Sequence, residues 1–264
     1  YGRSFLRYWG HDISTDANKD NVPDNVTIEE ARADYWPYRY GFPFEVTVDA
    51  DGEAAFARHH SMGRTSVELA MVMPDERTAY ITDDGSNGGL FLYFADKAGD
   101  LSAGTLYAMR WHQTDGGGAG AADLEWISLG HTTDAEIATL IEGGIVFSDI
   151  FNVTEAVLEE GDSGTPPIPT DECPEGYTAI NVDSYGMECL AVKKGMEVAA
   201  SRLETDRYAA MLGATLELRK LEGATHDPEH GRLYVAISDI DHGMLGGSAQ
   251  YDRGGGDHIQ LLSL

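Results

Sequence analysis

Apolar and polar residues alternate over many short stretches of the chain, and this pattern predicts β-strands. Most stretches are rich in β-branched or aromatic residues and are bounded by Gly, Asp or Asn. They lie at residues 43–52, 77–85, 89–96, 105–111, 124–130, 178–184, 232–239 and 258–264. The pattern therefore predicts an all-β fold class.

Helical spacing of apolar residues is rare. Residues 133–144 begin with a Thr-Asp cap and end in glycine, which predicts a short helix, and residues 197–214 have the same kind of pattern. Residues 26–36 add one or two further helical turns. The segments 112–123 and 159–190 are interpreted as insertions, because Gly, Ser and Pro leave little there to pack.

One segment of the chain recurs without a gap at an offset of 154 positions: residues 68–81 align with residues 222–235. The matched pairs include Glu68 and Glu222, Ala70 and Ala224, Pro74 and Pro228, and Tyr80 and Tyr234. Each copy is typical of a strand, a turn led by proline and a second strand. In an all-β chain such a repeat predicts β-propeller blades, with a sandwich of similar hairpins as the alternative. We interpret residues 1–264 as a single propeller domain, incomplete at its ends.

The chain is strongly acidic, with 45 Asp and Glu against 18 Lys and Arg and a formal net charge of −27. This charge repels the phosphates of nucleic acids and anionic membrane surfaces, so we expect no nucleic-acid partner. High salt, abundant divalent cations or selection for solubility are alternative reasons for it. No apolar run reaches the length of about 18 residues that a membrane-spanning helix needs.

Residues 16–29 contain a candidate calcium loop. The pattern Asp-x-Asn-x-Asp-x-x-x-Asp supplies oxygens from Asp16, Asn18, Asp20 and Asp24 and from the carbonyl of Val22. There is no acidic residue at the twelfth position, so the loop resembles the shorter thrombospondin type rather than an EF-hand. The pattern predicts structural calcium, and a solvated acidic turn is the alternative.

The chain has two cysteines, Cys173 and Cys189, which stand 16 positions apart. In an exported protein they would form a local disulfide, and in a cytosolic protein they would be free thiols. The calcium-type acidic sequence favours export. We therefore expect a periplasmic or extracellular protein.

The glutamates of the repeat, Glu68 and Glu222, have apolar residues close by, where an unpaired carboxylate is costly to bury. Carboxylates from separate blades would converge on a central channel and would be protonated or bind metal there. Alternatively, each glutamate bonds to backbone amides. Asp83 and Asp84 follow the first copy, and Lys220 precedes the second glutamate.

Four segments resemble, in order, the blocks of PhoX-type alkaline phosphatases and their uncharacterised relatives: 40–46, 59–111, 212–239 and 254–264. The resemblance implies an exported six-bladed β-propeller whose channel holds calcium and iron and hydrolyses phosphomonoesters. It places metal ligands at Glu68 and Glu222, with Asp83 or Asp84 close to an acidic strand end. Lys220 stands where the family has an arginine that contacts the substrate phosphate, and lysine lacks the bidentate fork of that arginine.

One departure from the family concerns cysteine. The Cys-Glu-Glu block that supplies a ligand for iron in the family is missing before residue 40, and the end at Leu264 falls short of a Cys-Gly block. We expect either a fragment of a longer chain or a relative that lost the enzyme.

Two functions follow from the sequence. The first is an exported metal-dependent phosphomonoesterase that acts on a small phosphate ester through Glu68, Glu222 and Lys220. The alternative is a non-catalytic calcium-binding propeller that serves as an extracellular surface or assembly module. The sequence leaves oligomer formation open.

Overall fold

The computed structural model describes residues 27, 29–30, 33, 35–117, 120–159, 168–169, 172–182, 186–240 and 244. The chain divides into two compact units, 1–40 and 41–264. In the first, Thr27 and Glu30 form a capping box, in which each backbone N–H donates to the side chain of the other residue. The 3-10 helix η1 (Pro37–Arg39) follows. The candidate calcium ligands between Asp16 and Asp24 lie outside the described residues.

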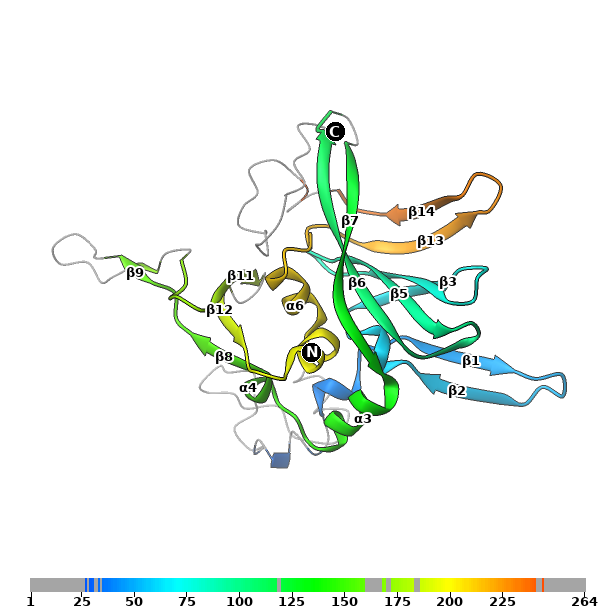
Figure 1. The fold of residues 1–264 in the computed structure, drawn as a ribbon, viewed down its shortest axis with the longest axis horizontal. Coiled ribbons are helices and arrows are strands. Elements are labelled where there is room, and N and C mark those ends of the chain that lie inside the picture. The colour runs from blue at the N-terminus through cyan, green and yellow to red at the C-terminus, as the bar shows by residue number, and fades with distance from the viewer. Residues whose placement is uncertain are drawn as a thin grey trace, which may run out of the picture. The chain divides into compact units, whose positions relative to one another are not determined.

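A five-stranded antiparallel sheet forms the centre of the second unit (Figure 1). Its strands are β3 (Val67–Val72), β4 (Thr78–Asp83), β5 (Leu90–Lys97), β6 (Asp100–Asp115) and β7 (Ala121–Thr133), in sequence order. Alternate residues of β4, β5 and β6 are buried, among them Ile81, Phe91, Tyr93 and Leu106. The alternation that predicts these strands is therefore the alternation between core and surface. Residues 112–117 and 120–123 belong to the far end of the β6–β7 hairpin, where His112 pairs with Asp123.

Smaller antiparallel sheets surround this sheet. They are β1 (Phe44–Val48) with β2 (Ala54–Arg58), β13 (Leu221–Asp227) with β14 (Arg232–Ile237), β9 (Leu158–Glu159) with β10 (Ile168–Pro169), and β8 (Phe151–Thr154), β11 (Thr178–Val182) and β12 (Gly186–Val192) in the order β11-β12-β8. In Figure 1, β1–β2, β3 and β13–β14 extend toward the same side. The mainly β fold is confirmed. The part of the chain that the structure describes forms no closed ring of blades.

Short helices connect the sheets: η2 (His60–Met62), α3 (Asp134–Glu142), α4 (Phe147–Ile150), α5 (Glu197–Leu203) and α6 (Thr205–Met211). Helix α3 confirms the prediction for 133–144, since Thr133 and Glu136 form a capping box and Gly143 ends the helix. The predicted helix at 197–214 is interrupted at Glu204, whose φ is −130°. There the Thr205 hydroxyl donates to the Ser201 carbonyl at 2.9 Å and competes with a helical backbone bond.

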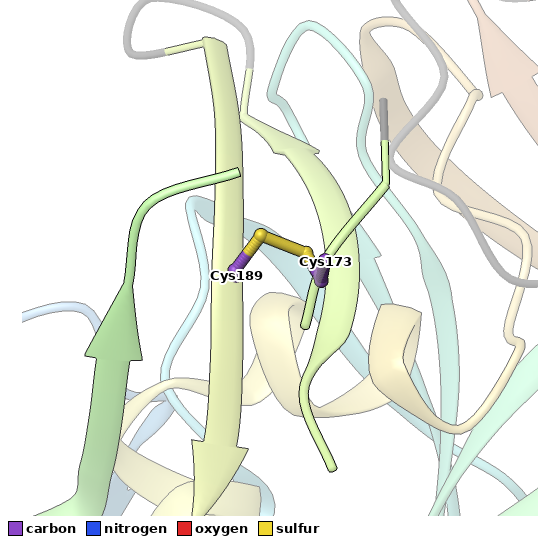
Figure 2. The surroundings of a disulfide bond; sticks show 2 residues. All are labelled: Cys173 and Cys189. Carbon is purple, nitrogen blue, oxygen red and sulfur yellow. A yellow bond between two sulfur atoms is a disulfide. The ribbon is translucent and has the colours of Figure 1, made fainter. Parts of the chain in front are cut away.

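The two cysteines form a disulfide (Figure 2). Cys189 lies on β12 and is fully buried, and Cys173 lies on the segment that leads into β11. Their Cα atoms are 5.5 Å apart, within the usual range for this bond. The disulfide that we expected for an exported chain is therefore present, and it fixes the segment before β11 to the three-stranded sheet.

Arg202 of α5 is fully buried and binds two other segments of the second unit. Its Nε donates to the Ser61 carbonyl at 2.6 Å, and Nη2 donates to the Gly130 carbonyl at 2.7 Å. Nη1 donates to the Ser201 hydroxyl at 2.7 Å and to the Leu129 carbonyl at 3.4 Å. Burial lowers the pKa of Arg202 to about 10, so the guanidinium is still charged at neutral pH. Its hydrogen bonds join α5 to η2 and β7.

His59 lies between two carboxylates that belong to different elements. Its Nδ1 is 3.1 Å from Oδ2 of Asp134, at the start of α3, and its Nε2 is 3.0 Å from Oε2 of Glu45, in β1. Both ring nitrogens can donate only in the protonated imidazolium. Burial lowers the pKa of His59, but the bonds to Asp134 and Glu45 outweigh burial and leave the pKa raised. The ion pairs therefore attach the β1–β2 hairpin to α3.

We expect His59→Gln to lower the free energy of unfolding by about 1–3 kcal/mol, because charge-assisted hydrogen bonds to two carboxylates are lost. Because the pKa of His59 is raised in the folded state, its protonated ring stabilises the protein fully below the unfolded pKa of about 6.5. This contribution is lost as the pH rises through the folded pKa. Urea denaturation at a series of pH values measures the difference between wild type and variant. A difference that does not shrink toward alkaline pH would contradict the charged assignment.

Candidate functional site

The two copies of the sequence repeat form hairpins with the same strand register. In β3–β4, Val67 pairs with Asp83 and Leu69 with Thr82; in β13–β14, Leu221 pairs with Ile237 and Gly223 with Ala236. Every residue in the second set lies 154 positions after its counterpart in the first. In each hairpin the register shifts across the glutamate, so Glu68 and Glu222 are the extra residues of equivalent β-bulges. The repeat is therefore structural, and it displays one carboxylate per copy.

The loop between β4 and β5 is hydrogen-bonded to the segment that precedes β13, and so it joins the first hairpin to the second. Gly88 and Leu218 form an antiparallel bridge, with N–H to carbonyl distances of 2.6 and 3.1 Å. Two residues further along, the backbone N–H of Lys220 donates to the Gly85 carbonyl at 3.1 Å. These bonds bring the residues after Asp83 next to the residues before Glu222, although the two segments are far apart in the sequence.

A cluster of charged and hydroxyl side chains lies at this junction, and we call Asp84, Lys220, Glu222 and Ser238 the Lys220 cluster. Nζ of Lys220 is 2.6 Å from Oδ1 of Asp84 and 3.5 Å from Oε1 of Glu222. The Ser238 hydroxyl donates to the same Oε1 at 2.8 Å. The hydrogen bond to Asp84 is the main cause that raises the pKa of Lys220. One ammonium is thus shared between carboxylates from both hairpins.

Lys220 has an unusual backbone conformation, with a φ of 55°. This left-handed region costs a residue other than glycine about 1–2 kcal/mol. Hydrogen bonds hold the residue there, since its N–H donates to Gly85 and its carbonyl accepts from the N–H of Ser238 at 3.0 Å. Such strain tends to occur where a side chain must be aimed, and it supports a functional role for Lys220.

Arg219 flanks the Lys220 cluster. Its Nε is 2.7 Å from Oδ2 of Asp239, and its Nη1 donates to the Ser86 hydroxyl at 3.4 Å. Arg219, Ser86 and Ser238 were not predicted from the sequence. The repeat could have indicated Ser238, which lies 154 positions after Asp84.

The adjacent aspartates Asp83 and Asp84 have different surroundings. Asp84 reaches Lys220, whereas Asp83 is 2% exposed and its carboxylate lies against the backbone of the β4–β5 loop. A Cβ on Gly88 would come within 3.2 Å of Oδ2 of Asp83, so glycine is needed there. Asn87 is also buried, and its amide atoms have no hydrogen-bond partner in the described part of the chain. Asp83 is thus placed to shape the loop that carries Asp84.

Glu68 is exposed, and its strand packs beside β13. Among the described residues, no hydrogen bond or ion pair joins it to the Lys220 cluster. His59 and His60, which precede it in the sequence, lie at η2, where His59 contacts Glu45 and Asp134. The structure therefore brings Glu222, Lys220 and Asp84 together, whereas Glu68 lies on the adjoining strand β3 and takes no part in the cluster.

The donor atoms at this junction are carboxylate and hydroxyl oxygens, which suit a hard cation such as calcium. Within the described ranges, no group of three or more His, Cys, Asp and Glu side chains is arranged to hold a metal ion. Both cysteines of the chain are in the disulfide, so neither offers a thiolate to iron. The oxygens of Asp84 and Glu222 are of the type that calcium prefers, but these two carboxylates alone do not make up a metal site in the described residues.

No helix in the described segments has the length and apolar character needed to cross a membrane. A search of curated proteins found no match, and neither did a search of solved structures. The sequence model of the family described as "Alkaline phosphatase PhoX" matches residues 9–253. This match spans both hairpins of the repeat and the whole Lys220 cluster, so the chain belongs to the PhoX alkaline phosphatase family.

Proposed function

We propose that the protein is a metal-dependent phosphomonoesterase that hydrolyses small phosphate esters at the Lys220 cluster. One observation carries the proposal: the Lys220 ammonium lies between Asp84 and Glu222, at the junction of two repeated hairpins. Carboxylates and an ammonium in this arrangement can bind a cation and a phosphate side by side. Membership of the alkaline phosphatase family supports the reaction class.

Asp84 and Glu222 would bind calcium, with Glu68 and Asp83 as further candidate ligands. Bound calcium would supply positive charge that stabilises the negative charge developing on the phosphoryl oxygens. Iron is proposed from family membership alone. Among the residues of this sequence it would bind through oxygen or nitrogen ligands, because Cys173 and Cys189 form the disulfide.

Lys220 would bind and orient the substrate phosphate. Its ammonium is a compact point charge with three donors on a flexible stem, in contrast to the rigid fork of an arginine. Ser238 would hold Oε1 of Glu222 in place through its 2.8 Å hydrogen bond. The matching geometry of the two bulges would hold the carboxylates of Glu68 and Glu222 at equivalent places in their hairpins.

We also propose the finer features of fold and location. The identical register of β3–β4 and β13–β14 supports blades of a six-bladed propeller in a single domain over 1–264. Segments 112–123 and 159–190 would be insertions in it, and 16–29 a structural calcium loop. The disulfide supports export to the periplasm or the extracellular space.

Hydrolysis of p-nitrophenyl phosphate in the presence of calcium, with and without iron, tests the reaction. We expect Glu222→Gln to lower kcat/KM by about 100-fold, or ~2.7 kcal/mol, because one carboxylate charge at the cation is lost. Glu229→Gln removes a charge from the exposed turn of the same hairpin and should retain the wild-type rate.

Two results would contradict the phosphatase. One is a wild-type protein that shows no turnover with either metal, and the other is an unchanged rate for Glu222→Gln. The first would favour the alternative function, a calcium-binding extracellular module without catalysis. Lys220 stands where the resemblance to the family implies an arginine that contacts the phosphate, and this difference keeps the alternative in place.

A further inference from the structure

Asn87 and Gly88, in the loop between β4 and β5, form a chemically labile pair. The backbone nitrogen of a glycine that follows an asparagine can attack Cγ of the asparagine side chain, because glycine has no side chain that blocks the approach. The chain has six asparagines, and the other five precede lysine or valine. Asn87 is therefore the asparagine whose amide group is most easily lost.

The conformation of the loop requires both members of this pair. Asn87 has a φ of 59°, in the left-handed region that asparagine tolerates better than most residues. A Cβ on Gly88 would lie 2.7 Å from the carbonyl oxygen of Asp83 and 3.2 Å from its Oδ2, so a larger residue does not fit. The labile pair is thus a consequence of how the loop is built.

The Asn87 amide is buried without compensation. Its side chain is 1% exposed, and both amide atoms lack a hydrogen-bond partner within the described ranges. An amide that is removed from water without gaining a partner is costly, and the cost is relieved whenever the loop opens. The Asn87 side chain therefore weakens the closed conformation that buries it.

The attacking nitrogen is occupied while the loop is closed. The backbone N–H of Gly88 donates to the Leu218 carbonyl at 2.6 Å, and the Leu218 N–H donates to the Gly88 carbonyl at 3.1 Å. Burial of Asn87 also keeps out the water that the reaction consumes. The bridge between Gly88 and Leu218 must therefore separate before the amide can react.

We propose that Asn87 is a deamidation site controlled by opening of the junction between the β4–β5 loop and residues 218–220. In the open loop the Gly88 nitrogen bonds to Cγ of Asn87, the bond from Cγ to Nδ2 breaks, and the proton of the Gly88 nitrogen leaves with Nδ2 as ammonia. Water then hydrolyses the succinimide ring to aspartate or isoaspartate at position 87. Water is the only co-reactant, and the inference is independent of the proposed function.

The product would prevent the junction from closing again. It places a new carboxylate at a position that is 1% exposed and adjoins Gly88, against which the Asp83 carboxylate already lies. Burial of a charge is costly, and two like charges at short range repel each other. Deamidation would therefore separate Asp84 from Lys220, which the closed junction holds at 2.6 Å.

Mass spectrometry of tryptic peptides after incubation at mildly alkaline pH measures the reaction. Cleavage after Arg77 and Lys97 releases Asn87 in one peptide, and a second peptide with Asn152 and Asn181 is the internal reference. We expect Asn87 to react before both reference residues, and at least about tenfold faster in urea than in the native protein, because local opening limits the native rate. Asn87→Gly suits the left-handed backbone and should show no change of mass in its peptide.

Two lysine variants test whether the junction controls the native rate. Lys220→Met removes the ion pair with Asp84 across the junction, so deamidation of Asn87 should become about two- to fivefold faster, as expected for the loss of one partly exposed pair. Lys194→Met removes an exposed charge between β12 and α5 and should leave the native rate unchanged. Thermal unfolding checks that both variants are folded during the incubation, and in urea all the proteins should react equally fast.

Three results would overturn the assignment. They are equal rates for native and urea-unfolded wild type, reaction of Asn152 or Asn181 before Asn87 in urea, and equal native rates for Lys220→Met and Lys194→Met. The first would show that the bridge to Leu218 does not protect the amide. These measurements need no turnover of a phosphate ester, so failure of the proposed function would leave their outcome unchanged.

Discussion

Replacement of Arg202 by methionine is expected to lower the free energy of unfolding by about 3–5 kcal/mol, because three backbone carbonyls each lose a charged donor, at roughly 1–3 kcal/mol per donor. The methionine fills much of the same volume but donates no hydrogen bond. The carbonyls of Ser61 and Leu129 would remain buried without this donor, and the partly buried carbonyl of Gly130 would lose it too. Because these carbonyls belong to η2 and β7, the loss affects the packing of α5 against two other segments.

Urea denaturation at pH 7 measures this effect. Arg232→Met is a matched control, because Arg232 lies exposed on β14 and its replacement should change the free energy of unfolding by less than about 0.5 kcal/mol. Arg202→Lys keeps the charge but loses the planar set of donors, so it should fall between wild type and Arg202→Met. A loss below about 1 kcal/mol for Arg202→Met would show that water or neighbouring donors replace the guanidinium.

Gly104→Ala is expected to destabilise the five-stranded sheet by about 3 kcal/mol, the upper end of the usual cost of overpacking. A Cβ at position 104 would lie 2.5 Å from the carbonyl oxygen of Phe94 and 2.7 Å from Cζ of Tyr93. The Phe94 oxygen belongs to the backbone of β5 and cannot move without opening the β5–β6 ladder. Tyr93 is fully buried, and its hydroxyl contacts the Ser61 hydroxyl at 2.9 Å, so it has no room to turn away.

Gly223→Ala is the control for this change. Gly223 also lies in a strand, but nothing stands within 4 Å of the Cβ that alanine would add. Its substitution should leave the free energy of unfolding unchanged or raise it by up to about 1 kcal/mol, because alanine restricts the unfolded chain. Thermal unfolding of both variants tests the comparison. Equal stability of Gly104→Ala and Gly223→Ala would mean that β5 and β6 are less closely packed than described.

Strands with a clear alternation of apolar and polar residues could be predicted from the sequence. The segments 77–85 and 89–96 contain β4 and β5, whose alternate side chains form the core. Strand β2 (Ala54–Arg58) was missed, because both of its faces are exposed and its alanines carry no strand signal. The burial of Arg202 was missed too, since helical spacing does not reveal which charged residue finds buried carbonyls.

The candidate site was predictable only as far as the repeat extends. The gapless alignment predicts that Glu68 and Glu222 are equivalent, and the matching bulges agree with it. The contact of Asp84 with Lys220 depends on the bridge between Gly88 and Leu218, which joins segments that share no local pattern. Long-range pairing of this kind is decided by the packing of the whole unit and leaves no periodic signal.

The equal register of the two hairpins has a consequence for how such a chain can diversify. The bulge at each glutamate is defined by backbone pairing, so neighbouring residues can be substituted without changing the bulge. Ser66 and Lys220 occupy one equivalent place, and Asp84 and Ser238 occupy another, yet each pair differs in charge. Two hairpins with the same register can therefore carry an acidic residue, Asp84, beside one copy and a basic residue, Lys220, beside the other while their backbones stay alike.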